Sequence, residues 1–122
     1  MKIPVLKQGE YLIASIQEAA TDADLQLLLN ELVRRVGEHR SKGVIVDVTV
    51  LDVMDSFAAR LLRDIANTVR LRGAETVIVG IQPDAAFTMV RLGMTLDDVA
   101  TALDLEEGVA YLDRTLKRKR GS

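Results

Sequence analysis

The sequence contains no cysteine, no tryptophan and a single histidine, His39, among its 122 residues. Without cysteine, the protein can form no disulfide or reactive thiolate, and a zinc site would lack its commonest ligand. Aromatic residues make up 3% of the chain, too few for a stacking platform that binds single-stranded nucleic acid. The formal net charge of −2 provides no general attraction to nucleic acid or to anionic lipid. We therefore expect neither nucleic acid nor a membrane among its partners.

Long apolar runs are also missing, and the N-terminal segment MKIPVLKQGE has the pattern of neither a signal peptide nor a membrane span. We therefore expect a cytoplasmic protein. A length of 122 residues suits one domain with a sizeable core and is too short for two. We expect this domain to span residues 1–117 and a basic tail to follow at 118–122. No function is assigned to the tail, because cations at a helix end complement the helix dipole.

Strand and helix patterns alternate along the chain. Two short apolar runs around Gly9 predict a β-hairpin, and Thr21 with Asp24 has the pattern of a capping box at the start of a helix. Dense β-branched runs beginning at Gly43 and Glu75 predict two strands buried on both faces. A helical pattern follows each of them, and one more short strand is expected within residues 97–102 before a last helix.

Helical spacing of apolar residues predicts which side of each long helix is buried. The last helix is also expected to be capped by Asp104, with Glu107 reaching back. The predicted buried residues are Leu25, Leu28, Leu29, Leu32, Val33 and Val36 in the first helix, Ala58, Leu61, Leu62, Ile65 and Val69 in the second, and Leu105, Val109, Leu112 and Leu116 in the last.

This order of elements predicts an α/β fold: a mixed, largely parallel sheet with right-handed crossovers and about four packed helices. Functional sites in such sheets lie beyond the carboxyl ends of the strands. Residues 47–56, with the sequence DVTVLDVMDS, form one such connection. The candidate site therefore lies there, around Ser56.

A serine nucleophile is one interpretation of Ser56. It would need a neighbouring base, usually a histidine. His39 lies before the third strand, at the opposite end of the sheet, and the G-x-S-x-G motif of hydrolase nucleophiles is missing around Ser56. We therefore do not expect hydrolysis by this serine.

Magnesium-dependent phosphoryl transfer is the stronger enzyme hypothesis. Asp47, Asp52 and Asp55 form an acid-rich loop of the kind that holds a metal ion and a phospho-aspartate. Such sites need several convergent acids and a cation for the phosphate, and no other strand end supplies them. We expect no catalytic residue, metal or cofactor, but this enzyme is kept as the alternative.

Helix capping is the simplest interpretation, because Asp55 or Ser56 could each cap the helix that follows. Either residue alone would be enough, so the presence of both exceeds what capping requires. Phe57 lies off the predicted buried stripe, where it would face solvent or a partner, or would pack against the loop.

The segments VIVDVT, LDVMDSF and VRLRGAETVIVGIQPDAAFTMVRLGM together resemble the STAS domain family of anti-sigma factor antagonists, over essentially the whole chain. In that family the serine or threonine after the aspartate is phosphorylated by a dedicated kinase. The resemblance implies that Ser56 is this residue, with Asp55, Asp52 and Phe57 around it. Thr49, on the same loop, is a weaker candidate for a second phosphorylation site.

Simple antagonists of this family commonly follow the phosphorylated serine with a small residue and glycine, whereas this chain has Phe57 and Ala58 there. That departure, with the RGAETVIVGIQP segment, is similar to the stressosome branch and to its short, RsbS-like scaffold components. The resemblance implies a non-enzymatic scaffold that sequesters an RsbT-like switch kinase and releases it when phosphorylated. It also implies RsbR-like co-scaffolds, an RsbX-like phosphatase and a large oligomer that regulates a stress response.

Overall fold

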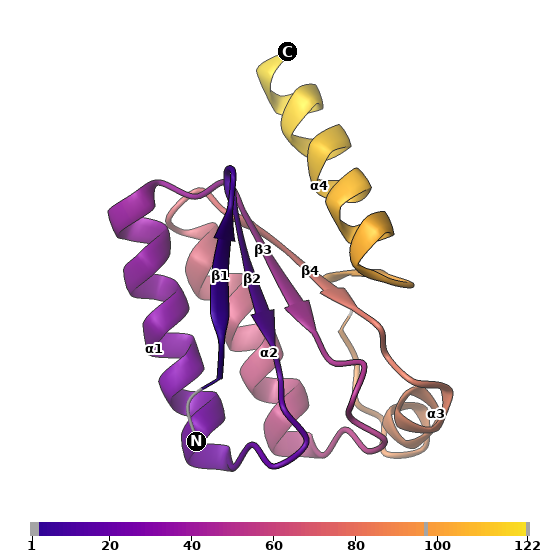
Figure 1. Cartoon of the computed structure of the whole chain (residues 1–122). Helices are drawn as coiled ribbons and strands as arrows, with labels where there is room; N and C mark the ends of the chain where they lie inside the picture. Colours follow the sequence, from indigo (N-terminus) through magenta and orange to yellow (C-terminus); the bar gives the residue numbers. More distant parts are fainter. Residues whose placement is uncertain (1–2, 97, 122) are drawn as a thin grey trace.

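The computed structural model describes residues 3–96 and 98–121, which form a five-stranded sheet with four helices (Figure 1). The strands are β1 (Val5–Gln8), β2 (Tyr11–Ser15), β3 (Gly43–Asp47), β4 (Glu75–Val79) and β5 (Ala100–Ala102). The helices are α1 (Asp22–His39), α2 (Ser56–Arg70), α3 (Pro83–Arg91) and α4 (Leu105–Arg120). This order is the predicted one. Asp97, where we expected the last strand to begin, lies outside the described residues.

The sheet is mixed and largely parallel, as predicted. Its strands lie in the order β1-β2-β3-β4-β5, and β1 is the antiparallel strand, paired with β2 through the hairpin at Gly9. Gly9 has a φ of +59°, a left-handed conformation that glycine adopts without strain. Strands β2 to β5 are parallel to one another, so their carboxyl ends meet at one edge, the lower edge in Figure 1.

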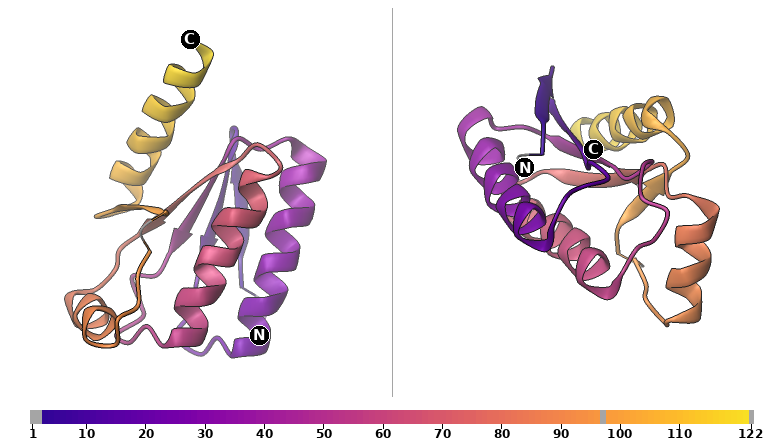
Figure 2. Two further views of the ribbon diagram at one scale, coloured as in Figure 1. Left: turned by 180° about the vertical axis from the view of Figure 1, so that it is seen from behind. Right: turned by 60° about the horizontal axis from the view of Figure 1, so that its bottom comes forward.

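Helices cover the two faces of the sheet unequally (Figure 2). Helices α1 and α2 pack on one face and enclose the main core, which includes Leu12, Leu32 and Ile65. Helix α4 lies on the other face over a smaller cluster, in which Ile45 and Leu112 are buried. The inner strands β3 and β4 are thus covered on both sides, which explains their β-branched runs.

The buried face of α2 differs from the predicted one at its first residue. Ala58 is only partly buried, whereas Ala59 beside it is fully buried. Helix α2 packs against both the sheet and α1, so it buries a wider arc than a helix that touches a single partner. The rest of the predicted stripe is correct: Leu61, Leu62, Ile65 and Val69.

Helix α4 also presents a different face to the sheet. Leu105 is exposed and Leu116 is only partly buried, so the predicted stripe is wrong at these two residues, whereas Val109 is partly buried and packs against the cluster. The buried face is centred on Gly108, Leu112 and Thr115 instead. A Cβ at Gly108 would lie 2.7 Å from Cγ1 of Val79, so the glycine lets the helix backbone approach the sheet closely.

Asp104 and Glu107, the two residues predicted to cap α4, both accept hydrogen bonds from backbone N–H groups at its start. The Asp104 side chain accepts a hydrogen bond from the Glu107 backbone N–H, as expected. Glu107 reaches back one residue further than expected, to the backbone N–H of Leu103.

The basic residues near the C-terminus continue α4 without a break as far as Arg120. Two of them bind acidic side chains: Lys119 binds Glu75 of β4 at 3.0 Å, and Arg120 binds Glu10 of the turn between β1 and β2 at 2.6 Å. Within the described part of the chain, none of the helices combines the length and the apolar character that a bilayer-spanning segment requires.

Candidate functional site

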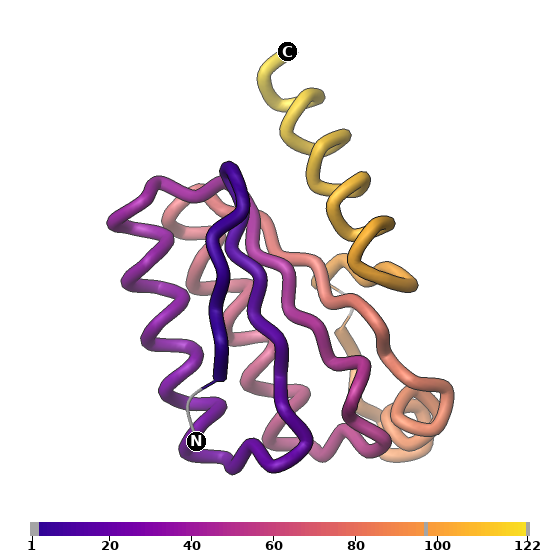
Figure 3. Tube along the Cα trace, in the orientation of Figure 1, coloured from indigo at the N-terminus to yellow at the C-terminus, as the bar shows by residue number. Residues whose placement is uncertain are grey.

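The connection between β3 and α2 lies at the carboxyl edge of the sheet, as predicted; its path is followed most easily in the trace of Figure 3. The Val48 backbone N–H continues the pairing with β4 by donating to the Val79 carbonyl at 3.0 Å. Met54 is fully buried in the main core, while Val53 beside it is exposed. Since Met54 fixes the end of the connection, Asp55 and Ser56 are held at the surface at a defined point.

Asp55, and not Ser56, caps α2. An oxygen of the Asp55 carboxylate accepts a hydrogen bond from the Ala58 backbone N–H at 2.8 Å. Ser56 is the first helical residue and is exposed, and its hydroxyl forms no hydrogen bond within the described residues. The two capping interpretations are thus resolved, and the serine hydroxyl has no part in the cap.

Phe57 is partly buried and packs against the main core, so it contacts the protein interior, and the contact shown is with the core and not specifically with the loop. Phe57 is one residue away from Ser56 around the helix, so its ring anchors the first turn of α2 while Ser56 stays on the outside.

Thr49 is engaged in a network that joins two loops at the carboxyl edge. Its hydroxyl donates to Oδ1 of Asp47 at 2.6 Å, and its carbonyl accepts from Nε2 of Gln82 at 2.6 Å. A Cβ at Gly80 would lie 2.0 Å from the Thr49 hydroxyl oxygen, so only glycine fits under this side chain. The network ties the loop after β3 to the loop that leads into α3.

Two of the three predicted aspartates, Asp47 and Asp55, have separate surroundings. The Asp47 carboxylate accepts hydrogen bonds from Thr49, and that of Asp55 caps α2. Across the residues that the structure describes, no group of three or more histidine, cysteine, aspartate or glutamate side chains is arranged to hold a metal ion. His39 ends α1 at the other edge of the sheet, as expected (Figure 1).

A pocket of about 200 Å³ opens beside Ser56. One wall is α2 and the other is the segment after α3. The lining residues are Ser56, Ala59, Arg60, Arg63, Gly93, Met94 and Thr95. The sequence analysis missed Arg60 and Arg63, although their spacing from Ser56 (four and seven residues) already places all three on one side of a helix.

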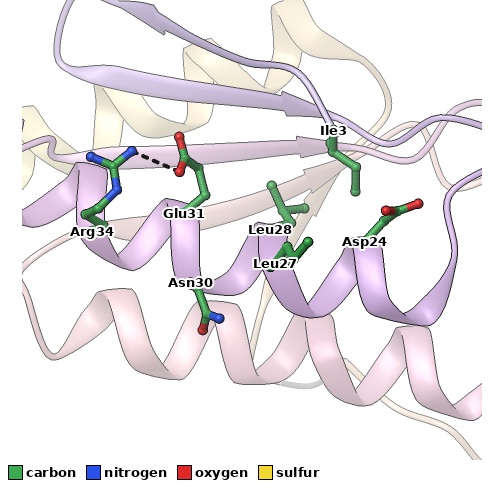
Figure 4. Close-up of a pocket in the computed structure, with 7 residues that line it drawn as sticks. All are labelled: Ile3, Asp24, Leu27, Leu28, Asn30, Glu31 and Arg34. Atoms are coloured by element: carbon green, nitrogen blue, oxygen red, sulfur yellow. Dashed lines mark hydrogen bonds and ion pairs between the residues drawn. The ribbon is translucent and has the colours of Figure 1, made fainter. Parts of the chain in front are cut away.

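A second pocket, of about 460 Å³, lies on α1 near Ile3 (Figure 4). Leucine side chains of α1 form its apolar part, and Glu31 and Arg34 form an ion pair at 2.9 Å at one end. None of the residues that we predicted for the functional site lines this pocket.

Comparison with known proteins identifies the family to which the chain belongs. The family profile of the STAS domain matches residues 2–108. Among curated proteins, "RsbT co-antagonist protein RsbRA" of Bacillus subtilis (strain 168) is 35% identical over 82 residues, which are 67% of this chain and 30% of that protein. The chain therefore matches less than a third of the length of this relative.

Two solved structures are similar over nearly their whole length. RsbS of Moorella thermoacetica with a serine-to-glutamate substitution gives a TM-score of 0.83 at 31% identity, covering 96% of this chain and 99% of that one. A chain of a structure described as the molecular architecture of the stressosome, a signal integration and transduction hub, gives 0.79 at 32% identity, covering 93% and 99%. The chain therefore belongs to the STAS domain family, and within it is similar to the RsbS and RsbR proteins of stressosomes.

Proposed function

We propose that this protein is a non-enzymatic scaffold of a bacterial stressosome. In this proposal it sequesters an RsbT-like serine/threonine switch kinase in the cytoplasm and releases it when Ser56 is phosphorylated. Release of the kinase regulates a stress-response pathway, through a sigma factor or another output. RsbR-like proteins are the co-scaffolds in the same oligomer, and an RsbX-like phosphatase resets the system.

The observation that carries this proposal is the state of the Ser56 hydroxyl. It is exposed at the first position of α2 and has no hydrogen-bond partner among the described residues, since Asp55 supplies the cap. A kinase can therefore reach the hydroxyl without unfolding the helix. Thr49 remains the weaker candidate, because its hydroxyl donates to Asp47 and would have to leave that bond first.

The proposed reaction is performed by the kinase on this chain. The Ser56 hydroxyl oxygen forms a bond to the γ-phosphorus of ATP, the bond between that phosphorus and ADP breaks, and the hydroxyl proton is lost. The product carries about −1.5 to −2 additional charges at the start of α2. The helix dipole stabilises an exposed anion there by about 0.3–1 kcal/mol, while Asp52 and Asp55 oppose it. The fold is therefore expected to survive phosphorylation, and the charge of the binding surface to change.

The similarity to both RsbS and RsbRA supports assembly with related STAS domains. Exposed apolar side chains near the carboxyl edge suit such contacts, since they would otherwise remain in water. They include Val50 and Val53 of the loop before α2 and Phe87 and Val90 of α3.

The test is phosphorylation by the purified RsbT-like kinase of the same organism with ATP, followed by intact-mass measurement. Wild-type protein is expected to gain one phosphoryl group, Ser56→Ala none, and Thr49→Ala one. Binding of the kinase to the phosphorylated and unphosphorylated protein is then compared. We expect at least a tenfold loss of affinity on phosphorylation, which corresponds to about 1.4 kcal/mol.

Two results would contradict the proposal. One is labelling of Ser56→Ala to the same extent as wild type. The other is equal affinity of the kinase for both forms, which would separate phosphorylation of Ser56 from release of the kinase.

A further inference from the structure

The pocket beside Ser56 contains two arginine side chains for which the described residues supply no acidic partner. Arg60 and Arg63 line it from α2, and neither forms a hydrogen bond or ion pair within the described residues. On α1 the situation is different: Arg34 binds Glu31 and Glu38, and Arg35 donates to the Val5 carbonyl. The described part of the chain thus leaves two neighbouring cations unpaired in a pocket that includes the candidate phosphorylation site.

Helix geometry places both arginines on the side of α2 that carries Ser56. The spacings of four and seven residues place the three side chains along one stripe of α2. At a rise of 1.5 Å per residue, Arg60 lies about 6 Å and Arg63 about 10 Å along the axis from Ser56. Long side chains in a helix lean toward its N-terminus, which is the direction of Ser56. Their length allows both guanidinium groups to approach a group attached to the Ser56 oxygen.

We propose that a phosphoryl group on Ser56 is bound within this chain by Arg60 and Arg63, in the pocket between α2 and the segment 93–95. This inference rests on the proposed phosphorylation of Ser56. Phosphoserine presents three acceptor oxygens, and guanidinium groups donate paired hydrogen bonds to such an anion. Thr95, on the opposite wall, offers a hydroxyl as a further donor. A pocket of about 200 Å³ holds several water volumes of about 30 Å³ each, so the group fits by displacing water.

The surrounding charges explain why the arginines are needed. Asp52 and Asp55 lie on the loop that leads into α2 and repel a phosphate, and Asp64 lies further along α2. Arg60 and Arg63 supply the compensating positive charge from the pocket side. Phosphorylation would therefore neutralise two exposed cations and join α2 to the segment after α3. A partner protein that binds this surface would therefore encounter two neutralised arginines as well as the new phosphate.

The experiment places phosphoserine at position 56 during translation, so that no kinase is needed. The second pKa of the phosphate is measured by ³¹P NMR in the wild-type background, in Arg60→Gln/Arg63→Gln and in Arg114→Gln/Arg118→Gln. The last variant removes two exposed arginines of α4, far from the pocket, and is the matched control. Glutamine preserves helix propensity in both variants.

Cations next to the phosphate stabilise its dianion, so we expect the pKa of the phosphate to be lower in wild type than in Arg60→Gln/Arg63→Gln by about 0.5 or more, around a free value of about 6. The control variant is expected to match wild type. Backbone amide signals of residues 93–95 should move on phosphorylation in wild type and stay in place in Arg60→Gln/Arg63→Gln. Equal pKa values and equal amide shifts in all three proteins would overturn the inference. Failure of the kinase to label Ser56 would instead overturn the proposed function and leave this measurement unaffected.

Discussion

The starts of α1 and α2 use the same kind of cap but differ in how completely it is built. At α1, Thr21 accepts from the Asp24 backbone N–H at 3.1 Å, and the Asp24 carboxylate accepts from the Thr21 backbone N–H at 2.9 Å. At α2, Asp55 accepts from the Ala58 backbone N–H, but no bond returns because the third helical residue is an alanine. The first start is a closed, reciprocal capping box and the second is one-sided.

The difference means that the start of α1 has only a structural role, whereas the start of α2 leaves a hydroxyl that can be modified. Every polar side chain of the α1 box is used in the box, and Asp24 is buried. The α2 start leaves an exposed hydroxyl next to its cap, with two arginines on the same side of the helix. A polar group that the fold does not use can be modified at little cost in stability, so the two starts should respond differently to substitution.

The largest effect is expected at the closed box. Thr21→Ala removes the side-chain acceptor for the Asp24 N–H and should lower the free energy of unfolding by about 1 kcal/mol, and by no more than about 2. Thr21→Ser keeps the hydroxyl oxygen and should recover most of this loss. Urea unfolding of the three proteins measures it. A loss under about 0.3 kcal/mol for Thr21→Ala would show that the box adds little to stability.

A smaller, pH-dependent effect is expected from the other arm of the box. The hydrogen bond from the Thr21 backbone N–H lowers the pKa of the Asp24 carboxyl below its usual value. A group whose pKa is lower in the folded state adds stability above its unfolded pKa, about 3.9, and loses it as the pH falls through the folded pKa.

Wild type should therefore be more stable than Asp24→Asn at pH 7, and the difference should shrink as the pH falls below about 4. Asp22→Asn, which removes a charge from the same turn, is the control for a general charge effect. Thermal unfolding between pH 7 and pH 3 checks this. A constant difference over that range would mean that the carboxylate is not what stabilises the helix start.

Patterns with a single local cause could be predicted from the sequence. The order of strands and helices, the Gly9 hairpin and both side-chain caps follow from periodicity and capping chemistry, and the structure contains them. The face of α4 could not be predicted, because Gly108 carries no side chain and gives no hydrophobic signal. Its effect comes from the close approach to Val79, which depends on a strand 29 residues earlier in the chain.

The same limit applies at the candidate site. Ser56 and the acidic residues before it were found because they are consecutive in the sequence and lie after a strand. The link from Thr49 to Gln82 joins residues 33 positions apart, and the second wall of the Ser56 pocket comes from residues 93–95. Contacts of this kind depend on how the loops meet at the carboxyl edge, which no local pattern specifies. Arg60 and Arg63 did carry a signal, their helical spacing from Ser56.

The smallest change in the free energy of unfolding is expected at Ser56. The comparison between the starts of α1 and α2 depends most on this result. Ser56→Ala removes a hydroxyl that has no partner among the described residues from the first helical position. Alanine is the better helix former there, so stability should stay within about 0.5 kcal/mol of wild type. Asp55→Ala, one residue earlier, removes the one-sided cap and should cost about 0.5–1 kcal/mol, less than Thr21→Ala. Both are compared by urea unfolding. Equal losses would mean that the Ser56 hydroxyl also has a structural task. A loss for Asp55→Ala alone would mean that the fold holds the serine in place through its neighbour and leaves its hydroxyl available to a kinase.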